Sequence, residues 1–427
     1  MIDSLDVMLW GNKVGTLVST KKGYKNQICF YFDRDFITLG FDIAPLRAST
    51  KAPAAQNGMP IYPETDKMFG GLPSFIADSM PDRWGNTVFN EWAKAHNIRR
   101  KDLTALDRLA YIGRRGMGAL EFVPPTNADM EKPFKVEIIQ LSKLAQKALS
   151  EAKNFHTILS PDFAIESLFK VGTSAGGRRP KAVINLNSET GECYSGQVPT
   201  PMAGFTPMII KFDEHGDVPT TRIEYSYYLM ARAAGLNMMP SRLIETGDET
   251  HFLTERFDRR NDEKIHIQTL AAMCPNSNSY EDLFDTAMKL NLSPKEMQHL
   301  YNQMVMNVVA ANVDDHNKNF SFVMGKDGIW HSAPAYDFTF AVDTSAPHFV
   351  NRHCLTINGE NQNISRADLV AVAKRYNIKS ADAIIDKSIG IVRNYRKFAT
   401  EANVPEEWIK KIEAEIDDRL ERISTDR

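Results

Sequence analysis

The stretch NVDDHNKNF, residues 312–320, concentrates two aspartates, a histidine, a lysine and three asparagines within nine residues. An apolar-striped segment precedes it, and SFVM (321–324), which is typical of a β-strand, follows it. Buried polar groups need hydrogen-bond partners. The stretch is therefore either a polar loop with local Asx turns or a loop built to hold a ligand.

The spacing inside this stretch favours a loop with a catalytic role. Asp314 and Asn319 are five residues apart, as are the Asp and Asn of the protein-kinase catalytic loop HRDxxxxN. In that loop the Asp orients the substrate hydroxyl and the Asn gives an oxygen to Mg²⁺. Asp337, in APAYDFTF (333–340), offers a second carboxylate, and Asp337-Phe338-Thr339 resembles the DFG triplet. We expect Asp337 to be carried on a strand that returns to the loop, although it also fits a helix N-cap.

Two upstream features follow kinase order. Lys211 ends the apolar strand MIIK on the face opposite Met208 and Ile210, and Glu224 in the next helix is its expected partner. The loop VGTSAGGRRPKA (171–182) has glycines that permit close backbone approach to an anion. Taken singly, the lysine could be a snorkelling strand residue and the loop merely flexible. The order of all five features favours a nucleotide site.

Composition limits the alternatives. The chain has 427 residues, a net charge of −3 and 43% hydrophobic residues, which is a globular profile without a field that favours nucleic acid. The four cysteines form no CxxC pair, so neither a disulfide framework nor a zinc site is expected. The sequence shows no signal peptide and no apolar run of about 20 residues, so we expect a cytoplasmic protein that makes no membrane contact.

The hydrophobic patterning predicts an α+β fold with two lobes, β-rich in the N-terminal half and α-helical in the C-terminal half. Ser293-Pro294-Lys295-Glu296 is a capping box with proline at the first helical position, and an apolar stripe follows it. We place the domains at 1–125, 126–257 and 258–427. The second would carry the glycine loop and strand lysine, and the third the catalytic loop in an all-α lobe.

The sequence resembles the HipA family, the serine/threonine-kinase toxins of bacterial HipBA-type toxin–antitoxin pairs. The N-terminal part of the resemblance comprises LWGNKVGTL, FIADSMPDRWG and IGRRGMGALEFVP. The kinase core comprises TSAGGRRPK, IIKFD, ERFDRR, DDHNKNFSF and YDFT. The resemblance runs nearly end to end and implies a fold related to protein and lipid kinases, with ATP and Mg²⁺ between the lobes.

Carried over by position, the resemblance makes Asp314 the catalytic aspartate, assisted by Lys211, and makes Asn319 and Asp337 the Mg²⁺ ligands. Glu224 would be a structural ion-pair partner. His316 would either touch the nucleotide or simply orient the loop. The implied ATP-binding residues are Gly176, Gly177, Arg178, Arg179, Pro180, Lys181, Lys211, Glu255, Arg256, Phe257, His316, Tyr336 and Asp337.

The resemblance also implies regulation and partners. Ser174 matches an autophosphorylated loop serine, with Thr173 beside it as the alternative. Phosphate there would carry about −1.5 to −2 charges and compete with ATP for the loop amides. A small helix-turn-helix antitoxin like HipB would be the partner, and DNA would be contacted mainly through it. The protein substrate would be a translation component such as an aminoacyl-tRNA synthetase.

Two other functions stay open. The HRD histidine and arginine are absent, and DxHxxN also fits kinases that act on a lipid or another small molecule. The chain could also be a nucleotide-binding co-repressor that acts mainly through a DNA-binding antitoxin.

Overall fold

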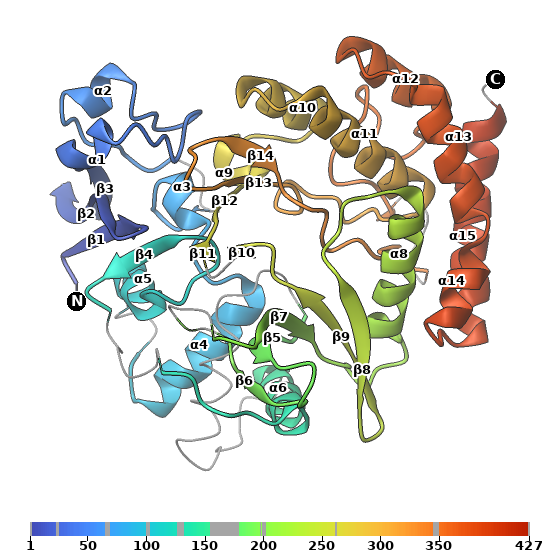
Figure 1. Ribbon diagram of the computed structural model, residues 1–427, viewed down its shortest axis with the longest axis horizontal. Coiled ribbons are helices and arrows are strands. Elements are labelled where there is room, and N and C mark those ends of the chain that lie inside the picture. The colour runs from blue at the N-terminus through green and yellow to red at the C-terminus, as the bar shows by residue number, and fades with distance from the viewer. Residues whose placement is uncertain are drawn as a thin grey trace.

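The computed structural model describes residues 2–22, 25–64, 69–99, 103–125, 132–153, 179–196, 198, 202–260, 263–344 and 350–425. Figure 1 shows three regions side by side: an N-terminal sheet with short helices, a second sheet around β5–β9, and a helical C-terminal end. This arrangement confirms the predicted fold class, with a sheet-rich N-terminal part and a helical C-terminal end.

The N-terminal region is built on an antiparallel sheet in the order β3-β2-β1-β4. The first two strands form a hairpin, and Gly11 at its turn has a φ of 82°, which favours glycine. The strands are β1 (Ser4–Leu9), β2 (Asn12–Lys22), β3 (Lys25–Phe32) and β4 (Leu120–Val123). The helices are α1 (Arg34–Thr38), α2 (Pro53–Gln56), α3 (Ser74–Ala77), α4 (Arg83–Ala95) and α5 (Ala105–Ile112).

The second sheet has the order β6-β5-β7-β9-β8. Its strands are β5 (Lys181–Leu186), β6 (Cys193–Ser195), β7 (Thr206–Lys211), β8 (Ser241–Thr246) and β9 (Glu249–Glu255). Met208 and Ile210 alternate into the core as their period-2 pattern predicts. Helix α6 (Ile138–Lys153) and helix α8 (Thr220–Ala234) belong to this region, and α8 ends at left-handed Gly235 as expected.

The C-terminal region is mainly helical. Helix α11 (Pro294–Val309) begins at the predicted capping box, in which Ser293 and Glu296 satisfy each other's backbone N–H groups, and it buries the predicted apolar stripe. The other helices are α9 (Leu270–Met273), α10 (Tyr280–Lys289), α12 (Arg366–Arg375), α13 (Ala381–Val392), α14 (Tyr395–Glu401) and α15 (Glu406–Thr425).

This region also contains strands, so it is not purely helical. A three-stranded sheet has the order β12-β13-β14 and flanks the catalytic-loop sequence. The strands are β12 (His266–Thr269), β13 (Ser321–Met324) and β14 (Trp330–Ser332), preceded by the short pair β10 (Arg259–Arg260) and β11 (Glu263–Lys264). The segment SFVM, predicted as a strand, forms β13 and pairs with β14.

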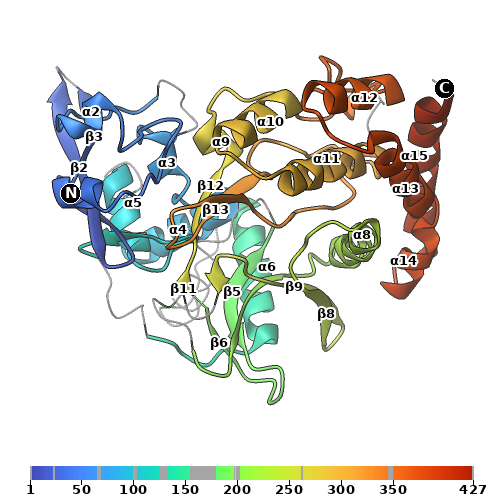
Figure 2. The same cartoon turned by 45° about the horizontal axis from the view of Figure 1, so that its top comes forward.

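Two hydrophobic cores tie the regions together. The larger contains residues of the N-terminal sheet and of α8, α10, α11, α13 and α15. The smaller joins α4 and α6 to β5, β7 and β9, so a helix from the first region packs on the second sheet. Figure 2 shows α6 beside β5 and β6, and α8 between β9 and the C-terminal helices.

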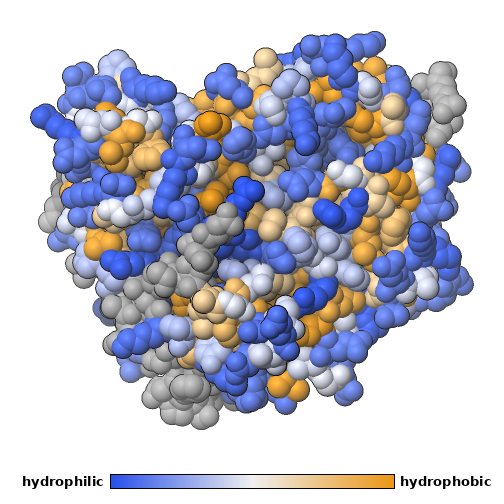
Figure 3. Space-filling model, viewed as in Figure 1, coloured by the Kyte–Doolittle hydropathy of each residue, from blue (hydrophilic) through white to orange (hydrophobic). Residues whose placement is uncertain are grey.

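On the outside, Figure 3 shows hydrophilic residues over most of one face, with smaller hydrophobic areas between them. Among the described residues no helix is long and apolar enough to cross a membrane.

Candidate active site

Two lysines lie directly opposite each other in the second sheet. The antiparallel register of β5 and β7 pairs Lys181 with Lys211. Lys181 is 3% exposed, and the Lys211 side chain is 11% exposed. Like charges at directly opposed positions destabilise a sheet. The pair therefore needs negative charge from elsewhere.

Lys211 receives that charge from two carboxylates. Its Nζ lies 2.5 Å from Oε1 of Glu224 on α8, which is the ion pair that the sequence predicted, and it also contacts Oδ1 of Asp337. Burial alone would lower the pKa of Lys211, but Asp337 and Glu224 outweigh it and raise the pKa above its ordinary value. We call Lys181, Lys211, Glu224 and Asp337 the lysine cluster.

Asp337 is held in an unusual backbone conformation. The prediction that it is carried on a strand is wrong: it lies in an irregular segment after β14, with a φ of 51°. A non-glycine residue in the left-handed region is uncommon, and such residues gather at functional sites. Burial alone would raise the pKa of its carboxyl, but Lys211 and Lys181, with a smaller effect of His316, hold it well below its usual range. Asp337 is therefore ionised.

The catalytic-loop sequence forms the link between α11 and β13. Asn319 donates from Nδ2 to the backbone oxygen of Asp314 at 2.7 Å, so the amide nitrogen braces the loop and the side-chain oxygen is left for another partner. Asp314 is exposed, whereas Asn319 is buried. Among the described residues, no hydrogen bond or ion pair joins Asp314 to Lys211 or Asp337. The loop and the lysine cluster interact electrostatically, since His316 makes a small contribution to the lowered pKa of Asp337.

His316 also orients the loop itself. Its Nδ1 accepts a hydrogen bond from the backbone N–H of Lys318 at 3.3 Å. The loop-orienting role expected for His316 therefore has a structural counterpart, and its contact with the nucleotide stays a prediction.

Tyr336 joins the loop to the segment after β9. Its hydroxyl donates to the backbone oxygen of Lys318 at 2.6 Å and lies 2.5 Å from Oγ of Ser321. Its ring stacks on Phe257, with centroids 5.6 Å apart and an interplanar angle of 28°. Two predicted ATP-binding residues thus form one half-buried aromatic pair.

The ERFDRR segment has a different character. Arg256 donates from Nε and NH2 to the two oxygens of Asp258 at 2.8 and 2.7 Å, and Arg259 donates to Asp258 Oδ2 at 2.8 Å. The backbone N–H of Gly118 donates to the same oxygen at 2.8 Å. We call Arg256, Asp258 and Arg259 the junction cluster, because it ties the segment after β9 to the N-terminal region.

The junction cluster bears on one predicted nucleotide contact. The guanidinium of Arg256 is buried against Asp258, and its backbone N–H donates to the Pro207 oxygen at 3.0 Å, so only its backbone oxygen remains for a nucleotide. Glu255 is half-buried, and its N–H is bonded to the backbone oxygen of Pro240. Contact of Glu255 and Arg256 with ATP stays a prediction.

The end of the glycine loop is described from Arg179 onward. Arg179 Nε lies 3.5 Å from Glu214 Oε1, and the Pro180 oxygen accepts from the N–H of Phe212 at 3.0 Å. Thr173, Ser174, Gly176, Gly177 and Arg178 lie outside the described residues, so their predicted roles stay predictions.

The N-terminal region contributes two acidic residues that sequence reasoning missed. Asp82 caps α4 by accepting from the N–H of Gly85 with Oδ1, while its buried Oδ2 has no hydrogen-bond partner. Burial raises the pKa of Asp82 to about 6, opposed by Lys181 and Lys318. Asp78 accepts from the N–H and Oγ1 of Thr269 at 2.6 and 2.8 Å. The only sequence signal was Pro-Asp before a helix, which predicts a cap and no more.

The tryptophan two residues after Asp82 explains this placement. Trp84 is fully buried and donates from Nε1 to the backbone oxygen of Lys181 at 2.8 Å. This bond fixes the N-terminal region against the first residue of β5. It also brings Asp82 close enough for the charge of Lys181 to lower the pKa of its carboxyl, against the effect of burial.

The donor set fits a magnesium ion bound with a polyphosphate. Within the described residues no group of three or more His, Cys, Asp or Glu side chains is arranged to hold a metal. Mg²⁺ is usually held by one or two carboxylates, with phosphate and water completing the shell. The ionised Asp337 carboxylate and the Asn319 oxygen are hard oxygen donors of that kind.

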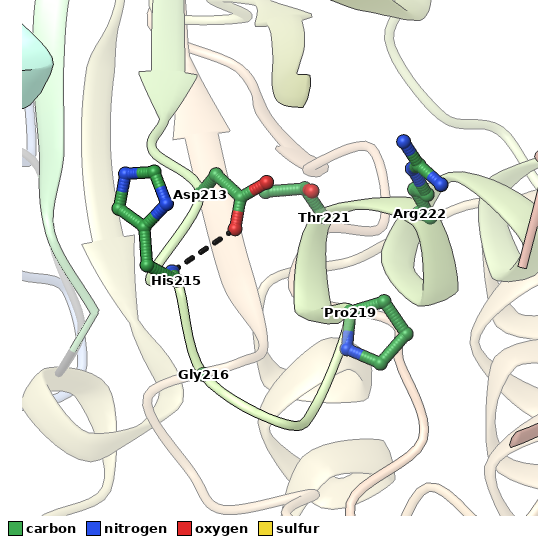
Figure 4. Close-up of a pocket in the computed structure, with 6 residues that line it drawn as sticks. All are labelled: Asp213, His215, Gly216, Pro219, Thr221 and Arg222. Carbon is green, nitrogen blue, oxygen red and sulfur yellow. Dashed lines mark hydrogen bonds between the residues drawn. The ribbon is translucent and has the colours of Figure 1, made fainter. Parts of the chain in front are cut away.

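One cavity of about 310 Å³ lies where β7 leads into α8. It is lined by Asp213, His215, Gly216, Pro219, Thr221 and Arg222, and Figure 4 shows the hydrogen bond from the His215 N–H to Asp213. No predicted site residue lines it, so it supports neither the nucleotide site nor an alternative to it.

A strand lysine paired with a helix glutamate, next to an Asp-x-His-x-x-Asn loop, defines a protein with a kinase-like fold. Comparison with known families agrees. The HipA N-terminal domain matches residues 5–123, and the HipA-like C-terminal domain matches residues 173–422. The chain belongs to the HipA family.

A solved HipA structure shows the same fold. HipA in the Shewanella oneidensis MR-1 toxin–antitoxin complex of HipA, HipB and operator DNA is 17% identical, with a TM-score of 0.68. The match covers 99% of this chain and 97% of that one. The proinflammatory kinase CtkA of Helicobacter pylori is 14% identical over 52% of this chain and 90% of its own, with a TM-score of 0.36.

Proposed function

We propose that this chain is an ATP- and Mg²⁺-dependent serine/threonine protein kinase that acts as the toxin of a type II toxin–antitoxin pair. The observation that carries the proposal is the directly opposed pair Lys181 and Lys211 on β5 and β7. Glu224 and Asp337 balance charge at Lys211 in the protein alone, and phosphate oxygens would compensate the opposed ammonium groups further, so the pair favours a polyanionic ligand.

The triphosphate of ATP is the ligand that this charge pattern suits. Lys211 is fixed by Glu224, so its ammonium group is already oriented when phosphate oxygens arrive. Pre-oriented cations stabilise the charge that spreads over the transferred phosphoryl group. Asp337 and Asn319 would hold Mg²⁺, which when bound neutralises phosphate charge.

Asp314 would accept the proton of the substrate. The hydroxyl oxygen of a serine or threonine forms a bond to the γ-phosphorus, and the bond from that phosphorus to its bridging oxygen breaks. The hydroxyl proton passes to the Asp314 carboxylate, and ADP leaves. The exposure of Asp314 suits this role, because a protein substrate has to reach it.

The adenine would lie beside the Phe257–Tyr336 pair. The backbone groups of Glu255 to Phe257 other than the N–H groups of Glu255 and Arg256, which are already bonded, would supply hydrogen bonds. Gly176 to Lys181 would cover the phosphates. Autophosphorylation of Ser174, or of Thr173, would place a competing phosphate in that loop and stop ATP binding.

A HipB-like helix-turn-helix antitoxin is the proposed partner. The similar Shewanella HipA is bound to HipB and operator DNA in its structure, which supports this assignment. With a net charge of −3, this chain would contact DNA mainly through the antitoxin. An aminoacyl-tRNA synthetase is the proposed protein substrate.

The same Shewanella complex favours a second candidate, a nucleotide-binding co-repressor without catalytic turnover. Phosphorylation of a lipid or another small molecule is the third, because the DxHxxN loop fits it equally well.

Incubation of the purified chain with γ-labelled ATP and Mg²⁺ separates these functions. We expect label on serine or threonine in the chain, and its loss in Asp314→Ala. Asp327→Ala, an exposed aspartate in the β13–β14 turn, is the matched control and should keep the label. Label that survives Asp314→Ala contradicts the proposal, and ATP binding without labelling favours the co-repressor.

A further inference from the structure

The second aspartate of the polar loop points inward. Asp315 is 1% exposed, although its neighbour Asp314 is exposed. Oδ2 of Asp315 accepts from the Tyr280 hydroxyl and from His353 Nδ1, both at 2.8 Å. Oδ1 accepts from the backbone N–H of Cys354 at 2.7 Å. Three donors therefore compensate the burial of this carboxylate.

His353 continues the contact toward the C-terminal helix. The ring is 2% exposed, and its Nδ1 must carry the hydrogen that it donates to Asp315. The other nitrogen, Nε2, then accepts from NH1 of Arg419 on α15 at 3.4 Å. Arg419, His353 and Asp315 thus form a buried chain in which each donor points toward the loop.

A second branch returns to the start of the loop. Nδ2 of Asn307 on α11 donates to the Tyr280 hydroxyl at 2.8 Å. Oδ1 of Asn307 in turn accepts from Nδ2 of Asn312 at 2.9 Å. Asn312 is the first residue of the polar loop, so the loop is fixed before and after Asp314.

The network ends at the proposed catalytic carboxylate. The N–H of Cys354 also lies 3.2 Å from the backbone oxygen of Val313, and the Cys354 Sγ lies 3.9 Å from Oδ1 of Asp314. Residues 353 and 354 therefore contact the loop on both sides of Asp314. A shift of either residue moves the backbone that carries this carboxylate.

We propose that Asp315 and His353 are positioning residues for the phosphoryl transfer, and that Arg419 couples them to α15. The inference rests on the proposed function. None of the three touches the reacting atoms; they hold the backbone of residues 313–315 so that Asp314 faces the acceptor hydroxyl. Displacement of a catalytic group by about 1 Å can cost about 100-fold in rate, so loss of this support should lower kcat.

The test compares four variants of the full chain: Asp315→Asn, His353→Ala, His353→Asn and Arg419→Gln. For each, kcat and KM for ATP are measured in the labelling assay, and the dissociation constant of MgATP is measured with a fluorescent analogue. We expect Asp315→Asn and His353→Ala to lose about 10- to 100-fold in kcat. Nucleotide affinity should stay within about twofold, because the lysine cluster is untouched.

His353→Asn provides the rescue. The amide of asparagine can take the place of Nδ1 and donate to Asp315, so this variant should recover most of the kcat that His353→Ala loses. Arg419→Gln, at the far end of the chain of contacts, should give a smaller loss. His299→Ala is the matched control, since this mostly buried histidine on α11 has an Nε2 without a hydrogen-bond partner.

The outcomes separate the two hypotheses. If the wild type binds MgATP but does not label, the proposed function fails and this inference fails with it. If the wild type labels and folded Asp315→Asn and His353→Ala keep their kcat, only this inference is wrong. Equal losses of affinity and kcat, or the same kcat for His353→Asn and His353→Ala, also overturn it. If His353→Ala does not fold, Asp315→Asn and Arg419→Gln decide.

Discussion

The junction cluster and the lysine cluster are both made of buried charges, but they are completed in different ways. In the junction cluster every oxygen of the Asp258 carboxylate accepts from an arginine, and Arg259 also donates to the backbone oxygens of Gly116 and Gly118. In the lysine cluster two ammonium groups oppose each other across a sheet, and Asp337 has a left-handed backbone. A buried oxygen of Asp82 nearby has no partner.

The difference separates structural charge from functional charge. A buried ion pair that is fully hydrogen-bonded holds two segments together and needs nothing further. A cluster with opposed like charges and an unusual backbone is costly unless a ligand completes it. Burial alone, which both clusters share, does not distinguish them.

The largest expected effect on stability comes from a substitution that disrupts the junction cluster. Asp258→Ala leaves two buried guanidinium groups without their carboxylate and should lower the free energy of unfolding by about 3–5 kcal/mol. Denaturation in urea measures this effect. Asp417→Ala, which removes an exposed aspartate of α15, is the control and should change it by less than about 0.5 kcal/mol. A loss below about 1 kcal/mol in Asp258→Ala would show that the cluster is not structural.

Neutralising Asp82, which interacts electrostatically with Lys181 of the lysine cluster, should have the opposite effect on stability. Asp82→Asn keeps the N-cap of α4 but removes a buried charge, so it should stabilise the protein at pH 7 to 8. A rise of the pKa from 3.8 to about 6 corresponds to about 3 kcal/mol, which is the upper bound of the gain.

The pH dependence of that gain follows from the sign of the shift. Because the pKa of Asp82 is higher in the folded state, its protonated form favours folding below pH 4, and this advantage is lost as the pH rises through about 6. The free energy of unfolding of the variant should therefore equal that of the wild type near pH 4 and exceed it most above pH 6. Thermal unfolding across this range checks it. A destabilised variant at pH 7 would mean that Asp82 is paired like Asp258.

Added MgATP should stabilise the protein through the lysine cluster and not through the junction cluster. At 100 times its dissociation constant, MgATP should raise the free energy of unfolding by about 2.7 kcal/mol. Asp337→Asn, which tolerates the left-handed backbone, should abolish most of this gain, whereas Asp417→Ala should keep it. Full stabilisation of Asp337→Asn by MgATP would exclude the lysine cluster as the nucleotide site.

The smallest expected effect on stability comes from an exposed ion pair, with which the buried charges of both clusters can be compared. The Lys13–Asp6 pair is 2.8 Å long but its side chains are about two-fifths exposed. Lys13→Met should therefore cost less than about 1 kcal/mol, and added salt should reduce even that. A larger cost, measured in the same urea experiment, would mean that burial is not what sets the size of the charge effects.

The sequence was informative where local rules decide. The capping box at Ser293, the β7 alternation and the Lys211–Glu224 pair all followed from spacing. Asp337 was misplaced on a strand, because its left-handed φ arises from the segments packed around it. Asp82 and the commitment of Arg256 to Asp258 were out of reach, since both depend on contacts between regions far apart in the chain.

The left-handed backbone at position 337 determines which substitutions at this codon leave the protein folded. A single base change converts an aspartate codon to asparagine or glycine, and both residues accept that conformation while discarding the negative charge. Glutamate keeps the charge but is less suited to the backbone. Under the proposed function, drift at this codon would yield intact proteins that have lost catalysis but still bind the antitoxin, and these would compete with an active copy in the same cell.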